Sequence, residues 1–375
     1  MIPLQRNVLL TPGPATTTDT VKWAQVVPDI CPREEHFGNL MDEVSLELTK
    51  LVADPLEYAT VLFCGSGTAA VEAIISSVTG PDDTLLIVNN GAYGKRMCEI
   101  AAAYGLQTVE FRSAPQLPLD MTSLEQCIRS SERPITKLAV VHHETTTGLL
   151  NDIEAIGRLC GNEIDMIVDA MSSFAAVPIR MKEMNIRYLA ASSNKCLQST
   201  AGISFAVADK SRLDSPPPRR ASNYYLNLHA QYSYFLLHRQ MRFTPPVQTM
   251  YALKQAIDEL KREGMTERYA RYVKCWDILI AGLNRLGLSF IGSEEGHSKM
   301  VTSIIEPDLP GYDFYELHDF LFSNGFTIYP GKIKELSTFR IANIGDISCK
   351  DIEELLTLLG HYFNRLHGRG VTNDD

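Results

Sequence analysis

The sequence has few of the features that would place a protein on nucleic acid or in a membrane. It carries 35 Lys and Arg against 45 Asp and Glu, a net charge of −10, and it has no basic run. An acidic chain is repelled by nucleic acid and by anionic lipid, so we expect neither partner. No apolar stretch reaches the length of about eighteen residues that a membrane-spanning helix needs. The start of the chain, Met-Ile-Pro-Leu-Gln-Arg, also lacks the charged and apolar regions of a signal peptide.

Cysteine is present, but not in a spacing that would bind a metal or staple a small fold. The eight cysteines are scattered along the chain, with no Cys-x-x-Cys pattern. Reduced cysteines in apolar runs behave as small hydrophobic side chains, and disulfides are rare in reducing compartments. We therefore expect free thiols and a cytoplasmic protein. The adjacent His142 and His143 would point to opposite sides of a strand, so we expect no metal there either.

The chain does have a regular alternation of apolar strands and helices. Its 375 residues, 45% of them hydrophobic, are enough for a large core and two or three lobes. Near-continuous Val, Ile and Leu runs between residues 59 and 208 indicate an α/β fold, with a mostly parallel seven-stranded sheet covered on both faces. The strands are expected near 59–64, 84–89, 107–111, 137–141, 164–168, 188–192 and 203–207, and the helices near 40–53, 66–79, 92–104, 121–130 and 152–161.

Beyond this sheet the sequence predicts a second, smaller α+β domain. The expected parts are an N-terminal arm 1–20, a large domain 21–250, a small domain 251–370 and a frayed tail 371–375. The helices of the later part are expected near 247–263, 267–286, 313–323 and 350–366, and its strands near 300–305 and 338–342.

Three connecting segments stand outside this pattern. The stretch from Ser215 to Pro246 is rich in Tyr and His and is expected to be a long loop that covers a pocket or reaches a partner subunit. The residues Asp29–Gly38 are expected to form a polar loop. The segment Asn7–Pro14 ends in a stiff Pro-Gly-Pro turn, and it either lies across a pocket mouth or is simply an arm.

A lysine and an aspartate follow two of the expected strands. Lys195 comes just after the apolar run Tyr188–Ser192, and Asp169 ends the run that begins at Ile164. A lysine at a strand end is ordinarily a surface residue. Together with a carboxylate on a nearby strand, however, it forms the pair that pyridoxal phosphate needs: the lysine holds the aldehyde, and the carboxylate keeps the ring nitrogen protonated.

A glycine-rich turn and an aromatic residue follow two further strands. Gly65-Ser66-Gly67-Thr68 leads from a strand into a helix, where glycines, hydroxyls and N–H groups suit a phosphate. A plain helix cap explains the same residues. Tyr93 follows the next strand, where it either stacks on a flat ring or caps the surface of a helix.

Hydroxyls and one arginine complete the candidates. The threonines at 145, 146 and 147 are suited to donate to a ring oxygen or a substrate, or they belong to a neutral loop. Arg340 lies in the middle of an apolar strand, where a guanidinium needs an anionic partner. That partner is either a substrate phosphonate or carboxylate, or an internal ion pair.

Taken together, these segments resemble the class V, fold-type I aminotransferases. The resemblance rests on Thr11-Pro-Gly-Pro14, Gly65-Ser-Gly-Thr68, Asn90-Gly-Ala-Tyr93-Gly, Glu144-Thr-Thr-Thr-Gly148, Val168-Asp-Ala-Met-Ser-Ser173, Ser193-Asn-Lys195-Cys, Arg242-Phe-Thr-Pro, Tyr329-Pro-Gly-Lys332 and Phe339-Arg-Ile-Ala-Asn343. It covers nearly the whole chain. The chain departs from the pattern after Lys195, where a Gly and a Pro are expected before Gly202, and again over 216–234.

The resemblance implies a homodimer that binds pyridoxal 5'-phosphate at the subunit interface. In it Lys195 would bind the cofactor's aldehyde and move the proton, Asp169 would pair with the ring nitrogen and Tyr93 would stack on the ring. The resemblance further implies a set of cofactor contacts from Ser66, Gly67, Thr68 and Ser192, from Thr146 near the ring hydroxyl and from Thr244 of the second subunit, and substrate contacts from Arg340 and Gly13.

The implied reaction is amino transfer between small molecules. The segments are most similar to family members that act on 2-aminoethylphosphonate and pyruvate, an aminophosphonate and a 2-oxo acid, in either direction. An alanine–glyoxylate or serine–glyoxylate aminotransferase and a lyase acting on a hydroxylated aminophosphonate remain open as alternatives. A cysteine desulfurase would need a mobile cysteine loop, and a regulator built on this fold would need a basic DNA-binding domain; we find neither in the sequence.

Overall fold

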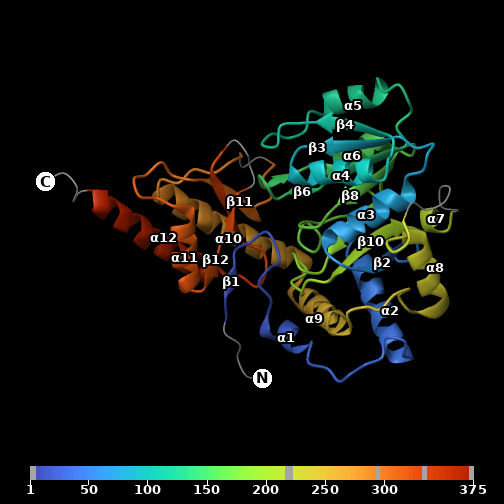
Figure 1. Cartoon of the computed structure of the whole chain (residues 1–375), viewed down its shortest axis with the longest axis horizontal. Helices are drawn as coiled ribbons and strands as arrows, with labels where there is room; N and C mark the ends of the chain where they lie inside the picture. Colours follow the sequence, from blue (N-terminus) through green and yellow to red (C-terminus); the bar gives the residue numbers. More distant parts are fainter. Residues whose placement is uncertain (1–5, 216–222, 293–295, 332–335, 371–375) are drawn as a thin grey trace.

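The protein has two packed regions, one built on a large sheet and one formed by the C-terminal third of the chain (Figure 1). The computed structural model describes residues 6–215, 223–292, 296–331 and 336–370. The first part of the predicted loop, 216–222, and the predicted frayed tail, 371–375, lie outside these residues.

The larger region is organised around a seven-stranded sheet. Its strands are β2 (Tyr58–Cys64), β3 (Leu85–Asn89), β4 (Thr108–Arg112), β5 (Lys137–Val141), β8 (Asp165–Asp169), β9 (Ile186–Ser192) and β10 (Ile203–Asp209). In space they follow the order β2-β10-β9-β8-β5-β3-β4, and all neighbours are parallel except the two pairs made by β10. The predicted mostly parallel α/β sheet is therefore confirmed.

Helices cover both faces of this sheet (Figure 1). One face packs against α3 (Gly67–Val78) and α4 (Ala92–Ala103), and the other against α2 (Glu35–Lys50), α5 (Met121–Arg129), α6 (Ile153–Cys160) and α9 (Val247–Glu263). Along β3, Leu85 and Ile87 point to the face covered by α3 and α4, whereas Leu86 and Val88 point to the face covered by α2, α5, α6 and α9. Because both faces are buried, such strands read as continuous apolar runs rather than as alternating ones.

The structure corrects two segments that were predicted to be loops. Helix α2 begins at Glu35, inside the predicted polar loop, because Phe37 and Met41 lie one turn apart and are both fully buried. The predicted long loop contains an eleven-residue helix, α8 (Leu228–His238), whose N-cap Asn227 accepts a hydrogen bond from the N–H of Ala230. Short elements complete this region: β1 (Val8–Leu9), α1 (Asp19–Trp23), β6 (His143–Glu144), β7 (Leu149–Leu150) and α7 (Lys210–Leu213).

The C-terminal region has its own core and a small antiparallel sheet. Its elements are α10 (Met265–Arg285), β11 (Val301–Ile305), α11 (Phe314–Ser323), β12 (Phe326–Thr327), β13 (Tyr329–Pro330), β14 (Thr338–Ala342) and α12 (Cys349–Gly370). Strand β14 lies between β11 and β13, and β1 from the N-terminus pairs with β12. Met250 and Leu253 of α9, on either side of the predicted domain boundary, both pack in the larger region. The domain limits stay predictions.

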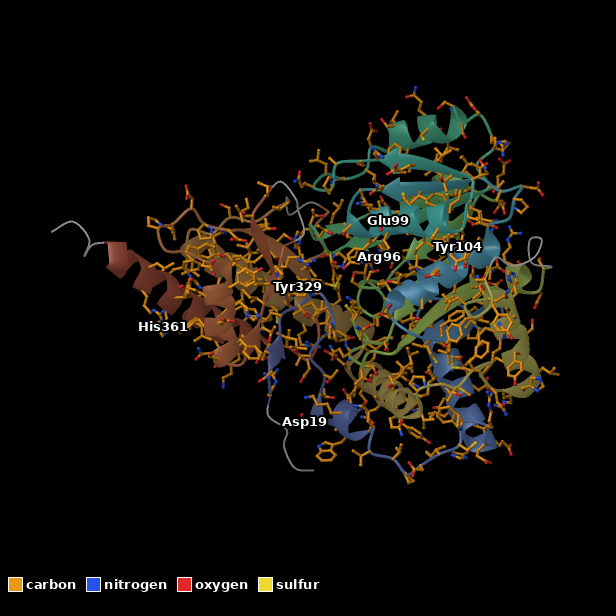
Figure 2. All side chains as sticks on the ribbon, viewed as in Figure 1. Asp19, Arg96, Glu99, Tyr104, Tyr329 and His361 are labelled. Carbon is orange, nitrogen blue, oxygen red and sulfur yellow. The ribbon has the colours of Figure 1, made fainter. Side chains whose placement is uncertain are left out.

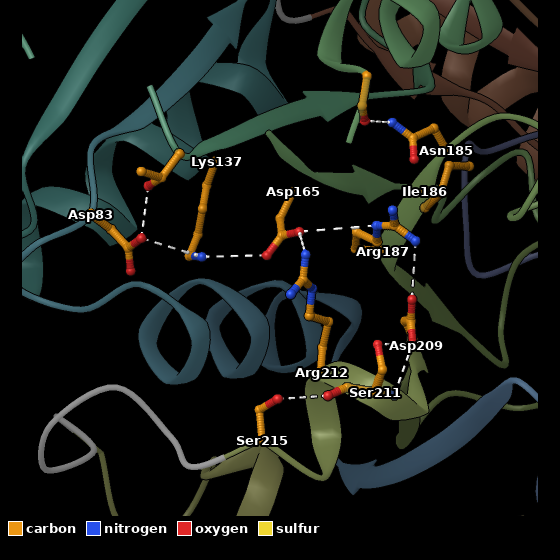
Figure 3. A network of polar contacts seen from close by, with 12 residues as sticks. Asp83, Lys137, Asp165, Asn185, Ile186, Arg187, Asp209, Ser211, Arg212 and Ser215 are labelled. Carbon is orange, nitrogen blue, oxygen red and sulfur yellow. Dashed lines mark hydrogen bonds and ion pairs between the residues drawn. The ribbon is translucent and has the colours of Figure 1, made fainter. Parts of the chain in front are cut away.

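A polar network lies along the amino ends of the parallel strands (Figure 3). The Nζ of Lys137 lies 3.4 Å from Asp83 and 3.6 Å from Asp165, and Arg212 donates to Asp165 at 2.8 Å. Lys137 and Asp165 are the first residues of β5 and β8, and Asp83 lies two residues before β3. Partly buried charges at this edge are thus paired with one another, and the opposite, carboxyl edge of the sheet is left for ligand chemistry.

Two expectations from the sequence concern the cysteines and the length of apolar helices. All eight cysteines are free thiols, as predicted. Within the described ranges, no helix combines the length and the apolar character needed to cross a membrane.

Candidate active site

Most of the sequence-predicted site residues meet in one cavity at the carboxyl edge of the large sheet. The cavity has a volume of about 200 Å³. Its lining includes seven of the predicted residues: Ser66, Gly67, Thr68, Tyr93, Asp169, Ser192 and Lys195. They come from the ends of strands and from the first turns of the helices that follow, which is where parallel sheets place their ligands.

The turn between β2 and α3 forms one wall of the cavity. Gly65 has a φ of 143°, a conformation that side chains rarely adopt, and this allows the sharp turn from strand to helix. Ser66 is the N-cap of α3, but its side chain makes no capping hydrogen bond, so a simple cap does not account for it. The hydroxyls of Ser66 and Thr68 and the first N–H groups of α3 suit an anion such as a phosphate.

Asp169 ends β8 at the floor of the cavity and is 6% exposed. Its Oδ1 accepts a hydrogen bond from the N–H of Met171 at 3.0 Å. Burial raises the pKa of Asp169 to about 6, and the Met171 N–H and the charges of Arg96 and Lys195 oppose that rise. A buried carboxylate in this position is stabilised by any further cation, such as a protonated ring nitrogen.

Lys195 follows β9 and is covered by the N-terminal segment. Its Nζ donates a hydrogen bond to the carbonyl oxygen of Pro12 at 2.7 Å. A Cβ added to Gly13 would lie 2.3 Å from that Nζ, and the φ of 133° at this position also disfavours residues other than glycine. The N-terminal segment therefore lies over the site rather than forming a detached arm. Gly13 touches Lys195 but is not among the residues that line the cavity.

The turn after Lys195, which departs from the family pattern, is held by helix α10. The Nη1 of Arg268, a residue only 1% exposed, donates to the carbonyl of Cys196 at 2.8 Å. Gln198, whose φ is 62°, donates from Nε2 to the hydroxyl of Tyr272 at 2.7 Å. Two buried contacts from one helix thus hold the turn that follows the lysine, although the turn lacks the Gly and Pro expected before Gly202.

The loop after β5 turns Thr145, and not Thr146, toward the cavity. The hydroxyl of Thr146 donates to Glu144 Oε1 at 2.5 Å, and its N–H donates to the same oxygen at 3.0 Å. Thr145 lines the cavity, and its Oγ1 is buried without a hydrogen-bond partner among the described residues. Thr145 rather than Thr146 thus lines the cavity, and the contact with the ring hydroxyl expected of Thr146 stays a prediction.

His143 offers a second buried polar atom in the same wall. Its Nε2 has no hydrogen-bond partner in the described part of the chain, while its Nδ1 lies 3.5 Å from the carbonyl of Ser172. Burial lowers the pKa of His143 to about 3, so the ring is neutral near pH 7. Unpaired buried polar atoms are rare in folded proteins, and those facing a cavity suit the polar groups of a ligand.

Arg340 lies on β14, directly behind the cavity wall. Its guanidinium donates to the carbonyls of Pro330 at 3.1 and 3.3 Å and of Thr145 at 3.4 Å, and lies 4.8 Å from the centre of the Tyr329 ring. Among the described residues, no carboxylate lies within 4.0 Å of it, so the expected alternative of an internal ion pair is not found there. The guanidinium is held by neutral carbonyls, is 1% exposed and is not among the residues that line the cavity, so its contact with a substrate stays a prediction.

Thr244 is not among the residues that line the cavity. It is exposed at the start of the connection to α9, and its carbonyl accepts a hydrogen bond from Cys64 Sγ at 3.5 Å. Its predicted phosphate contact requires a second subunit and stays a prediction.

The sequence analysis missed one charged residue in the cavity, Arg96. It lies on α4, three residues after Tyr93, and so shares the helix face of the tyrosine. That spacing was the available signal. Asn194 is a second missed lining residue, and its Oδ1 accepts a hydrogen bond from Ser192 at 3.0 Å.

The cavity fits the cofactor implied by the sequence. It brings together an anion cradle, an aromatic ring, a buried carboxylate and a lysine, the groups that hold pyridoxal 5'-phosphate. The unpaired Thr145 Oγ1 and His143 Nε2 leave partners for polar substituents of a ring.

Comparison with known proteins also indicates an aminotransferase family. The family described as aminotransferase class-V matches residues 24–333. The chain is 38% identical over 356 residues to a 2-aminoethylphosphonate–pyruvate transaminase of Salmonella paratyphi B, which covers 94% of this chain and 96% of that protein. The same identity and coverage apply to its counterpart from Salmonella enteritidis.

Solved structures are similar over almost the whole chain. An alanine–glyoxylate aminotransferase from Nostoc sp. superposes with a TM-score of 0.87 at 25% identity, covering 96% of this chain and 95% of that one. A ureidoglycine–glyoxylate aminotransferase from Bacillus subtilis gives a TM-score of 0.86 at 23% identity, covering 98% and 95%. The second likeness concerns the fold alone.

Proposed function

The chain belongs to the class V aminotransferase family, and from this premise we propose that it transfers an amino group between 2-aminoethylphosphonate and pyruvate. The products would be phosphonoacetaldehyde and alanine, and the same residues would serve the reverse direction. The proposal is supported by the 38% identity to transaminases of that name. The observation that carries it is the meeting of Lys195, Asp169 and the anion cradle in one cavity, with Arg340 behind its wall.

Pyridoxal 5'-phosphate, when bound, supplies an aldehyde that takes up the amine and a ring that accepts the electron pair of the broken C–H bond. The cradle of Ser66, Gly67 and Thr68 is proposed to hold its phosphate, with Ser192 beside it, and Tyr93 to stack on its ring. Thr145, whose buried Oγ1 has no partner among the described residues, is proposed to donate to the ring hydroxyl.

Lys195 is proposed to carry the proton. Its Nζ would act as the general base that removes a proton from the amine-bearing carbon of the substrate, and it would hold that proton for return. The carbonyl of Pro12, 2.7 Å from Nζ, fixes where that amine rests. Asp169 would stabilise positive charge on the ring nitrogen, because it is buried and, among the described residues, only the Met171 N–H donates a hydrogen bond to its carboxylate.

Arg340 is proposed to bind the anion of each substrate in turn. The phosphonate of the amino donor and the carboxylate of pyruvate would occupy one place, as expected when the two half-reactions share a site. A guanidinium is a good clamp for both groups, because its planar fork matches two oxygens at once.

The test is a measurement of both products. The purified protein with 2-aminoethylphosphonate and pyruvate should release phosphonoacetaldehyde and alanine in equal amounts. Each substrate alone should give at most one turnover, visible as a change of the cofactor absorbance. Steady release of ammonia without pyruvate would instead support the lyase alternative, and turnover of serine or alanine with glyoxylate, but not of the phosphonate, would support the alternative that the Nostoc sp. likeness favours.

We also propose that the chain works as a homodimer. The exposed side chains of Leu46, Leu236 and Leu237 gather where α2 and α8 border a groove, and they are 42%, 62% and 76% exposed. Large exposed apolar patches mark association surfaces. The exposed Thr244 follows α8 closely in the chain, which is consistent with its predicted contact across the interface.

Replacing both Leu236 and Leu237 with glutamate is expected to yield monomers, because burying two carboxylates at an interface is strongly unfavourable. Light scattering on a sizing column measures the mass. Tyr315→Glu on α11, at 71% exposure, is the matched control and should leave the dimer intact. A monomeric parent protein at micromolar concentration would refute the proposal.

A further inference from the structure

Within the described residues, the cavity is lined by two cations, Lys195 and Arg96. Neither the chemistry nor the resemblance has given Arg96 a role. It lies on α4, and in Figure 2 it appears near the middle of the molecule, between Glu99 of the same helix and Tyr329 of the C-terminal region. Its side chain is half-buried in the cavity wall.

The guanidinium of Arg96 contacts both the anion cradle, at Thr68, and the Tyr93 ring. Its Nη1 donates to Thr68 Oγ1 at 3.3 Å, in the first turn of α3. Its central carbon lies 4.9 Å from the centre of the Tyr93 ring, a cation–π distance. No carboxylate of the described residues lies within 4.0 Å of it, so the charge is not neutralised by an ion pair there.

The charges in the cavity wall indicate what this cation can do. The wall carries Asp169 as its acid, Lys195 and Arg96 as its cations, and His143, which is buried. In the proposed function Lys195 gives up its charge to covalent binding, and Asp169 pairs with the ring nitrogen. The phosphate of the cofactor, a monoester with up to two negative charges, would then contact only hydroxyls and N–H groups of the cradle. Arg96 is the remaining cation in the cavity wall that could neutralise it.

We propose that Arg96 is a cofactor-binding residue that neutralises the phosphate of the bound cofactor, next to Thr68. This rests on the proposed function, because it takes that cofactor as the occupant. The weak 3.3 Å contact with Thr68 leaves the remaining N–H groups of the guanidinium for phosphate oxygens. The stacking on Tyr93 would hold the planar group in place for that contact.

The experiment compares two ligands that differ only in the phosphate. Full-length protein freed of cofactor is titrated with pyridoxal 5'-phosphate and, separately, with pyridoxal, and binding is followed by absorbance. For Arg96→Gln we expect the Kd of pyridoxal 5'-phosphate to rise by about 10- to 100-fold, the range for losing one hydrogen bond to a charged group. The Kd of pyridoxal should stay within about twofold, and Arg96→Lys should recover part of the loss by keeping the charge.

Two further measurements keep the result interpretable. The control Tyr93→Leu removes the stacking ring and should weaken both ligands alike. Phosphorus NMR of the bound cofactor should show the phosphate dianion becoming the monoanion at higher pH in Arg96→Gln than in the parent, because the dianion has lost a neighbouring cation. Equal weakening of both ligands by Arg96→Gln would overturn the proposal and assign Arg96 to holding Tyr93; an unchanged Kd for both would also overturn it.

Failure of the proposed function looks different. A parent protein that binds neither pyridoxal 5'-phosphate nor pyridoxal would remove the premise. A parent that binds the phosphorylated ligand much more tightly than pyridoxal, with Arg96→Gln indistinguishable from it, would remove only the role of Arg96.

Discussion

Lys195→Ala is expected to lower the rate of amino transfer by about 10⁴-fold or more, since general base catalysis alone contributes up to about 10⁴-fold. The variant loses both the nitrogen that binds the cofactor covalently and the group that moves the proton. Alanine also removes the contact to Pro12 without adding bulk next to Gly13, so the cavity should stay open. Steady-state assays with 2-aminoethylphosphonate and pyruvate measure the loss.

A covalent readout supports the kinetic one. After borohydride reduction, mass spectrometry of the parent should find a pyridoxyl adduct on Lys195 and none in the variant. Lys182→Ala is the matched control, because this lysine is 71% exposed and pairs with Glu57 far from the cavity. An added primary amine such as methylamine should restore part of the lost rate, which a merely misfolded variant would not show. Parental turnover by Lys195→Ala would refute the assignment.

The sheet was predictable because burial on both faces leaves a strong local signal. Six of its seven strands are runs of mostly apolar residues, whereas the edge strand β4 alternates as Thr-Val-Glu-Phe-Arg, and all observed starts lie within two residues of the predicted ones. The helices that cover it have apolar residues on one side. Tertiary packing and local sequence therefore indicate the same structure, which is the condition for a reliable prediction.

Helix α8 was missed because its apolar residues do not face one side. Leu236 and Leu237 are adjacent and both largely exposed, while Leu228 and Tyr232 face the core. A helix that presents apolar residues to solvent as well as to the core has no amphipathic period, and it reads as an irregular aromatic stretch. Asn227, a good N-cap residue, was the local sign of its start.

The site was predictable as a set of strand ends, but not at the level of single hydroxyls. The sequence places three threonines after β5, and only the folded loop shows that Glu144 takes the hydroxyl of Thr146 and leaves that of Thr145 to the cavity. Contacts between distant segments were equally out of reach. The hold of Arg268 on Cys196 joins residues 72 positions apart, and no local pattern reports such a pair.

Arg340→Ala is expected to raise the KM for both 2-aminoethylphosphonate and pyruvate by about 100-fold, because a charge-assisted bidentate contact is lost from the binding of each anion. Arg340→Lys keeps the charge but loses the planar fork, so its KM values should lie between those of the parent and those of Arg340→Ala. Arg180→Ala, at a residue 73% exposed and paired with Glu183, is the control with unchanged kinetics.

The burial of Arg340 makes a stability measurement necessary beside the kinetics. The alanine variant leaves the carbonyls of Pro330 and Thr145 without their donors and opens a void behind the wall, so urea unfolding should show a loss of stability. Arg340→Lys keeps a donor and fills most of that space. If both variants kept the parental KM for either anion while losing stability, the arginine would be structural. If KM rises in both variants while the lysine variant stays nearly as stable as the parent, the increase in KM reports lost anion binding. A general loosening of β14 would instead raise KM only in a variant that has also lost stability.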